Sequence, residues 1–319
     1  MSDWRGGLRK MQVELGEIVR YRLFPEQGGL CLNDSLGQSI RLCFTGAIHC
    51  VACDRLTKKS FNQGYCFPCL RKLAACDSCI VSPEKCHLAE GTCREPDWAE
   101  THCQVPHIVY LSNTSSVKVG ITRETQIPTR WIDQGATQAK PIARVQTRLQ
   151  SGLLEVLCAQ QVGDRTAWQT MLKGNGEPQD LEAIRQKVMA SCKAGIADLQ
   201  LQYGESAFEL LEDAPETEIE YPVLNWPEKV KAHNFDKQPV VEGTLMGIKG
   251  QYLMLDTGVL NIRKFGGYEV EIDDDVTVRV PFDWFASPDM SNLWKGLAPG
   301  IGGAAGISTW SCICATHNV

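Results

Sequence analysis

The sequence contains no long run of apolar residues. No stretch reaches the roughly 18 consecutive apolar residues that a membrane-spanning helix needs, and residues 1–7 do not form the apolar centre of a secretory signal. We therefore expect a cytoplasmic protein with no membrane association. In that compartment cysteine thiols stay reduced, so disulfides are not expected.

The sequence also has no general excess of basic residues. Its net charge is −6 at pH 7, which excludes a protein coated with cations for polyanion binding. The charge is uneven, because residues 117–150 hold six basic and two acidic side chains, whereas residues 205–289 hold seven basic and eighteen acidic ones. We expect any nucleic acid to meet the centre of the chain and to avoid the C-terminal third.

Cysteine, in contrast, is abundant and clustered, with nine of the fifteen cysteines lying between Cys50 and Cys103. The first four, Cys50, Cys53, Cys66 and Cys69, form two Cys-x-x-Cys turns. Two such turns supply the four thiolates that tetrahedral zinc prefers. Four protein ligands leave no position for a substrate, so this spacing predicts a structural zinc site.

The remaining cysteines of this cluster predict a second structural zinc site. Cys76 and Cys79 form a third Cys-x-x-Cys turn and should supply half of it. The other ligands come from a larger set, and among its members we favour Cys86 and Cys93. The full set is Cys86, His87, Cys93, His102 and Cys103.

The pattern of apolar residues predicts an α+β protein with several units. Alternating apolar and polar residues in 8–48 and 239–272 are typical of antiparallel strands, and periodic segments in 153–161, 166–172 and 180–201 indicate helices. The predicted units are an N-terminal β region (8–48), a zinc-binding module (49–105), an α+β domain (106–205), a linker (212–238), a C-terminal β region (239–272) and a flexible tail (273–319).

The centre of the chain carries four motifs in a fixed order. They are His107-Ile-Val-Tyr-Leu111, Val117-Lys-Val-Gly120, Arg130 at the start of a predicted helix, and Glu155 on a later helix. In this order and spacing the segment 106–172 resembles the GIY-YIG nuclease superfamily. The resemblance implies a small α+β domain that cleaves phosphodiester bonds with Mg²⁺ or Mn²⁺.

The resemblance also implies catalytic roles. Tyr110 would activate water, Arg130 would stabilise the transition state, and Glu155 would hold the divalent ion. Two positions depart from the superfamily pattern, because Lys118 replaces the tyrosine of the second strand and Ile108 replaces the glycine of the first. Lys118 completes the candidate site, and we assign DNA or RNA contacts to Arg123, Trp131 and Arg144.

The chain as a whole resembles an uncharacterised bacterial family, domain of unknown function 2797. The resembling segments include Lys58-Lys-Ser-Phe61, Gly91-Thr-Cys-Arg-Glu-Pro96 and Gly120-Ile-Thr-Arg123, and the resemblance extends over residues 8–272. This family implies no activity.

Three functions agree with these patterns. The first is a zinc-containing nuclease that acts on DNA or RNA. The second is a nucleic-acid-binding module that keeps the nuclease-like scaffold and cuts nothing. The third is a zinc-stapled scaffold for a protein partner, which the acidic C-terminal third favours.

Overall fold

The computed structural model describes residues 4–162 and 167–273. The predicted tail, apart from residue 273, lies outside the described residues. Antiparallel sheets and helices occur together, which confirms the α+β prediction. The strands are β1 (Trp4–Gly7), β2 (Gln12–Glu14), β3 (Arg20–Leu23), β4 (Leu30–Cys31), β5 (Ser39–Ile48), β6 (His107–Asn113), β7 (Val117–Arg123), β8 (Gln138–Val145), β9 (Phe208–Leu210), β10 (Thr217–Glu218), β11 (Val240–Lys249), β12 (Tyr252–Leu255), β13 (Gly258–Asn261) and β14 (Tyr268–Asp273). The α-helices are α1 (Phe67–Lys72), α2 (Pro96–His102), α3 (Thr129–Asp133), α4 (Arg148–Ala159), α5 (Trp168–Met171) and α6 (Leu181–Tyr203).

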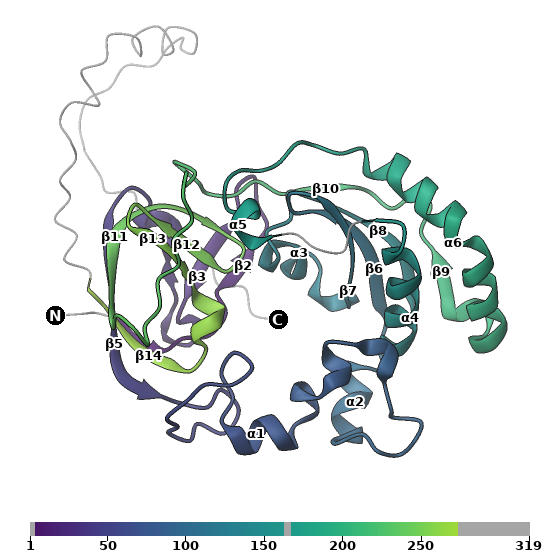
Figure 1. Ribbon diagram of the computed structural model, residues 1–319, viewed down its shortest axis with the longest axis horizontal. Coiled ribbons are helices and arrows are strands. Elements are labelled where there is room, and N and C mark those ends of the chain that lie inside the picture. The colour runs from purple at the N-terminus through teal and green to yellow at the C-terminus, as the bar shows by residue number, and fades with distance from the viewer. Residues whose placement is uncertain (1–3, 163–166, 274–319) are drawn as a thin grey trace, which may run out of the picture. The chain divides into compact units, whose positions relative to one another are not determined.

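The two ends of the described chain share one sheet. Its strand order is β1-β14-β5-β11-β12-β13, all antiparallel, so strands from the N-terminal β region alternate with strands from the C-terminal one (Figure 1). Val241 pairs with Leu42, and Val270 pairs with Phe44. Residues about 200 positions apart in sequence therefore become neighbours, and we call this part of the molecule the β unit (residues 4–48 and 239–273).

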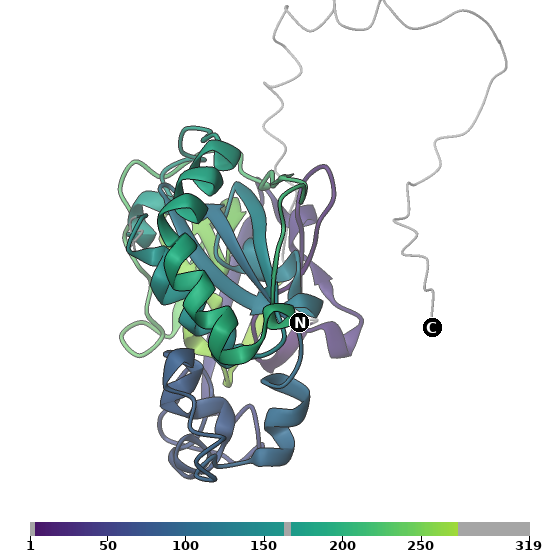
Figure 2. The ribbon, with the colours of Figure 1, turned by 90° about the vertical axis from the view of Figure 1, so that its right-hand side faces the viewer.

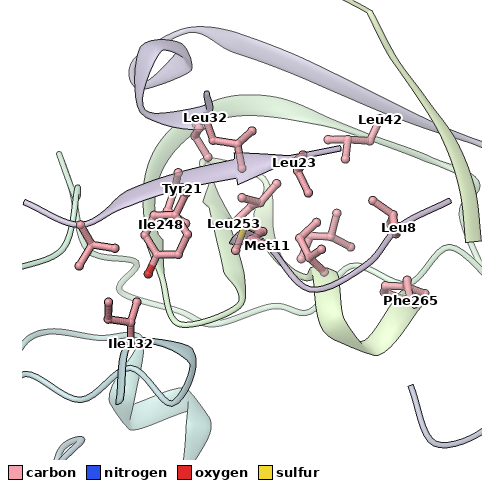
Figure 3. Packing of buried hydrophobic residues seen from close by; sticks show 14 of the residues in the cluster. Leu8, Met11, Tyr21, Leu23, Leu32, Leu42, Ile132, Ile248, Leu253 and Phe265 are labelled. Carbon is pink, nitrogen blue, oxygen red and sulfur yellow. The ribbon is translucent and has the colours of Figure 1, made fainter. Parts of the chain in front are cut away.

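A single apolar core holds the β unit together. Leu8, Met11, Tyr21 and Leu23 from the N-terminal segment pack with Leu253 and other side chains of the C-terminal segment (Figure 3). Ile132 of α3 joins the same cluster, so the central part of the chain packs against the β unit. Residues 212–238, predicted as a linker, contribute strand β10 and buried side chains to this structure, namely Ile219, Tyr221 and Phe235.

The central sheet has the strand order β10-β8-β6-β7, with β9 also paired to β8. Helices α4 and α6 pack against it (Figures 1 and 2), and each begins with a capping side chain. Thr147 and Gln150 form a reciprocal capping box at the start of α4, and Asp180 accepts a hydrogen bond from the backbone of Ala183 at the start of α6.

Strand β6 is buried on both faces because its side chains alternate between two cores. Val109 and Leu111 face the cluster formed with α4 and α6, whereas Ile108 and Tyr110 belong to the core of the β unit. This alternation places Tyr110 on the side of the sheet that meets the β unit.

Residues 49–105 form a third part, the cysteine module. It contains α1, α2 and three turns of 3₁₀ helix at Ala74–Cys76, Ser78–Ile80 and Pro83–Lys85. Its first residues continue directly from β5, and His49 donates its backbone N–H to Gly267 at 2.7 Å.

Candidate functional site

The first four cysteines come together as one cluster. The sulfurs of Cys50, Cys53, Cys66 and Cys69 all lie within 4.8 Å of one another. Cys53 Sγ and Cys66 Sγ are 3.8 Å apart, which is about the separation of two sulfurs bonded to one tetrahedral zinc at about 2.3 Å each. All four are free cysteines. The two turns can therefore hold a metal ion, as their spacing predicts.

Backbone amides favour a negative charge on this cluster. The N–H of Cys66 donates to Cys50 Sγ at 3.2 Å. Burial opposes ionisation of Cys50, but donors from Cys66, Ala52 and Cys53 outweigh it and lower the pKa of the Cys50 thiol to about 6. Burial and hydrogen bonds to its neighbours raise the pKa of the Cys69 thiol. One thiolate, that of Cys50, therefore forms readily, whereas Cys69 keeps its proton until an ion replaces it.

A second group of metal-ligating atoms lies further along the module. Oxygen, sulfur and nitrogen atoms of Asp77, Cys79 and His87 lie within 4.8 Å of one another. Asp77 is already engaged, because it forms an ion pair with Arg94 Nε at 2.9 Å and accepts a hydrogen bond from the backbone N–H of Ser78 at 2.6 Å. This group can bind a metal ion in principle.

The four ligands predicted for the second zinc site do not all line one cavity. Cys79, Cys86 and Cys93 line one small cavity, together with Cys103. Cys76 is not among the residues that line this cavity, and its side chain is hydrogen-bonded to Asn62. The imidazole of His102, which also belongs to the predicted set, stacks on Trp98 with ring centroids 4.1 Å apart.

Tyr110 lies at the centre of the nuclease-like motifs. It pairs directly with Gly120 across β6 and β7. A Cβ atom at position 120 would lie 2.8 Å from Tyr110 Oη, so only glycine lets the tyrosine ring cross the neighbouring strand. The hydroxyl donates to Gln134 Oε1 at 2.8 Å, and the ring meets Trp131 edge to face at 5.9 Å.

The four predicted catalytic residues are brought within electrostatic range of one another. Burial raises the pKa of Tyr110 to about 12, against the opposing effect of the Arg130 guanidinium, and Glu155 raises it further. Burial and Arg130 lower the pKa of Lys118, whereas Glu155 opposes this change. These side chains come from β6, α3, β7 and α4.

A cavity of about 510 Å³ opens beside this group. Lys118 and Gln134 line it from the central part of the chain, and Arg263 and Lys264 line it from the β unit. Trp168 and Tyr252 also line the cavity, and their rings stack in parallel at 5.6 Å with an interplanar angle of 4°. These features give it three basic side chains and an aromatic platform, and Asp133 adds one carboxylate to the lining. Another cavity, of about 530 Å³, lies beside β1 and is lined by none of the four catalytic candidates.

The residues to which we assigned nucleic-acid contacts lie elsewhere. Trp131 is only 2% exposed and packs in the core of the β unit. Arg144 pairs with Glu124 at 3.0 Å and with Glu209 at 3.7 Å. Arg123 ends β7 and is half-buried. The sequence carried one unused signal, the basic pair Arg263-Lys264, which lies in the turn of 3₁₀ helix (Ile262–Phe265) that follows strand β13.

A family model described as "Protein of unknown function (DUF2797)" matches residues 37–270. The chain belongs to this family. No curated protein and no solved structure matches the chain. Among the described residues, no helix combines the length and apolar character needed to cross a membrane.

The DUF2797 match includes the whole cysteine module and all four catalytic candidates. Strands β1 to β4 lie outside it, although Leu8, Met11 and Tyr21 from this segment complete the core of the β unit. The matched DUF2797 region therefore depends for its packing on residues that precede it.

Proposed function

We propose that this protein binds nucleic acid and cleaves phosphodiester bonds with the help of a divalent metal ion, next to a zinc-stabilised module. The observation that carries the proposal is that the charges of Arg130 and Glu155 act on both Tyr110 and Lys118. Lys118 also lines the cavity, together with the cations Arg263 and Lys264. A phosphate group needs such positive charge, and a hydrolytic site needs ionisable groups within reach of it.

Each residue has a role in this proposal. Glu155 would hold Mg²⁺ or Mn²⁺, which would neutralise charge on the scissile phosphate. Arg130 stabilises the additional charge of the transition state. Tyr110 keeps its proton, because its pKa is raised to about 12 and its hydroxyl donates to Gln134, so it orients groups in the site. Lys118, whose pKa is lowered, is better suited than Tyr110 to accept a proton from water.

The cavity provides the recognition surface. Arg263 and Lys264 can contact phosphate groups, and the stacked rings of Trp168 and Tyr252 offer a face on which a base can stack. These residues replace Trp131 in our proposal, because a buried ring is not accessible to a base. Zinc on Cys50, Cys53, Cys66 and Cys69 stabilises the module and takes no part in the reaction.

A second candidate function is binding without cleavage. The buried, protonated Tyr110 favours it, since a phenolate is the usual activated form of a tyrosine base. In this case the same cavity holds a single strand of DNA or RNA and no bond is broken.

The test uses labelled single-stranded and double-stranded DNA and RNA with Mg²⁺ or Mn²⁺. We expect cleavage that falls about 100-fold or more in Glu155→Gln and Arg130→Ala. Glu228→Gln is the matched control because Glu228 is exposed and is not among the residues that line the cavity. Full activity in Glu155→Gln would refute the active site.

Binding measured at several salt concentrations separates the alternatives. Phosphate contacts make affinity fall steeply with added salt, and Arg263→Ala should weaken binding under all conditions. Salt-dependent binding without cleavage by the wild-type protein would establish the second candidate. The absence of both would favour a scaffold for a protein partner.

A further inference from the structure

We propose that Cys79, Cys86, Cys93 and Cys103 form a second zinc site, and that this site fixes helix α4 to the cysteine module. The proposal replaces Cys76, which the sequence spacing favours, by Cys103. It does not depend on the nuclease proposal, because it concerns metal content and the anchoring of a helix.

The four thiols line one small space; of them only Cys79 belongs to a group of ligating atoms that all lie within 4.8 Å of one another, so the other three must move closer to bind an ion. They line a cavity of about 10 Å³. A space of roughly 10–15 Å³ accommodates one sphere of the size of a water molecule, and therefore one ion. Cys103 is buried, the other three are partly buried, and all four are free cysteines. Soft thiolate ligands select zinc among the common divalent ions of cells.

The other polar groups beside this cavity already have partners. The carboxylate of Asp77 is fixed by an ion pair with Arg94 and by a hydrogen bond from the backbone N–H of Ser78. His87 has its Nδ1 at 2.7 Å from Thr92 Oγ1 and its Nε2 at 3.4 Å from Asp77 Oδ2. The carboxylate and the imidazole thus hold the loop together, and the thiols are the donors left for an ion.

A buried cation lies next to these thiols. Four thiolates on Zn²⁺ carry a net charge of −2, and a partly buried site with such a charge needs a counter-ion. Arg148 interacts electrostatically with Cys103 and Cys79. Its Nε atom is buried and has no hydrogen-bond partner among the described residues. A bound metal would therefore add negative charge beside this guanidinium, which also interacts electrostatically with Glu155.

Arg148 also joins the site to helix α4, of which it is the first residue. Its backbone N–H donates to the carbonyl of Cys103 at 2.7 Å, and its Nη2 donates to the carbonyl of Ile80 at 2.7 Å. One turn later, a Cβ at Gly152 would lie 2.6 Å from the backbone nitrogen of Glu84, so the loop touches the helix directly. A metal that orders this loop would orient α4.

Metal analysis of the purified full-length protein tests the ligand set. We expect two zinc ions per chain in the wild type and in Cys76→Ser. One ion should remain in Cys103→Ser, in Cys86→Ser, and in Cys69→Ser, which reports on the first site. Asp77→Asn and His87→Gln should keep both. Loss of an ion in Cys76→Ser with retention in Cys103→Ser would overturn the assignment, and so would iron in place of zinc.

Two further measurements sharpen the test, and the first needs no cysteine variant. Seven of the fifteen cysteines lie outside the two sites. In the wild type, a mercurial thiol reagent should release both zinc ions only after it has reacted with eight thiolates beyond those that react without releasing zinc; release of both by six would overturn the second tetrathiolate site. Hydrogen exchange of α4 should accelerate in Cys103→Ser and stay unchanged in Cys69→Ser. Equal protection of α4 in both variants would refute the anchoring role.

Discussion

The cysteine module and the β unit are stabilised by different interactions. The buried residues of 49–105, all of which the structure describes, are small or polar: Cys50, Gly64, Cys66, Ala74, Asp77, Pro83, Ala99 and Cys103. The β unit instead buries large apolar side chains such as Met11, Leu253 and Phe265. A segment without such a core cannot offset the entropy of folding by apolar burial, so we expect the folding of the module, but not that of the β unit, to depend on a bound metal.

The largest expected effect is therefore the response to chelation. Removing zinc at neutral pH should abolish protection from hydrogen exchange in 49–105, since a structural zinc contributes about 10–16 kcal/mol of folding free energy. Amides of β5 and β11 should keep their protection. A loss of protection that is uniform along the chain would contradict the comparison. The control is a matched dialysis without chelator.

The same contrast explains what the sequence could predict. The ligands of the first site follow from local spacing, because each Cys-x-x-Cys turn brings its own two sulfurs together. The cysteines of the second set are separated by segments of six to nine residues, one of which contains helix α2, and from the sequence such segments permit several closures, so the spacing alone favoured Cys76. The sequence did not predict the side chains that line the cavity beside Lys118, for a related reason. Trp168 and Tyr252 stack across 84 positions, and no local pattern encodes a contact at that distance.

The sequence also predicted part of the arrangement around strand β6. Its apolar residues predicted a strand, and the motif order predicted that Tyr110, Arg130 and Glu155 belong together. The sequence could not show that both faces of the strand are buried, because this depends on the β unit packing against it. That packing buries Tyr110 and raises its pKa.

The second prediction tests the apolar side of the comparison. Leu253→Ala in β12 should lower the free energy of unfolding by about 2–5 kcal/mol, since Leu253 is fully buried and the substitution leaves a cavity. Zinc content should not change. Urea unfolding followed by circular dichroism measures the effect. Leu224→Ala serves as the control, because Leu224 is 51% exposed and should change stability by less than about 0.5 kcal/mol.

The third prediction concerns a charge inside the apolar part of the molecule. Lys249 is fully buried, and its ammonium donates to the carbonyl of Gly174 and lies 5.2 Å and 5.1 Å from the rings of Tyr221 and Trp226. Burial lowers the pKa of Lys249 from 10.5 to about 8, although Glu220 opposes the shift. Between these values the unfolded chain binds more protons, so this group makes stability rise with pH.

The destabilising effect of the buried Lys249 ammonium is complete below about pH 8 and disappears as the pH rises to 10.5. The unfolding free energy of the wild type, relative to Lys249→Met, should thus increase by about 3 kcal/mol between pH 7 and pH 10.5. Chemical denaturation of both proteins at several pH values measures it. A constant difference would show that the ammonium is not desolvated.

The smallest effect is expected from an ion pair on the surface, because water screens its charges. Arg144 on β8 donates to both carboxylate oxygens of Glu124, at 3.0 Å and 3.2 Å, yet the two side chains are 38% and 46% exposed. Solvent screens such a pair and its ordering costs side-chain entropy, so a double-mutant cycle of Arg144→Gln and Glu124→Gln should give a coupling below about 1 kcal/mol. The coupling should fall further in 1 M salt.

Since Arg144 is neutralised by its neighbours, Arg144→Gln should also weaken nucleic-acid binding less than Arg263→Ala does. If Arg144→Gln weakened binding more than Arg263→Ala, Arg144 would belong to the recognition surface. Its ion pair with Glu124 would then have to open when a phosphate competes for the guanidinium.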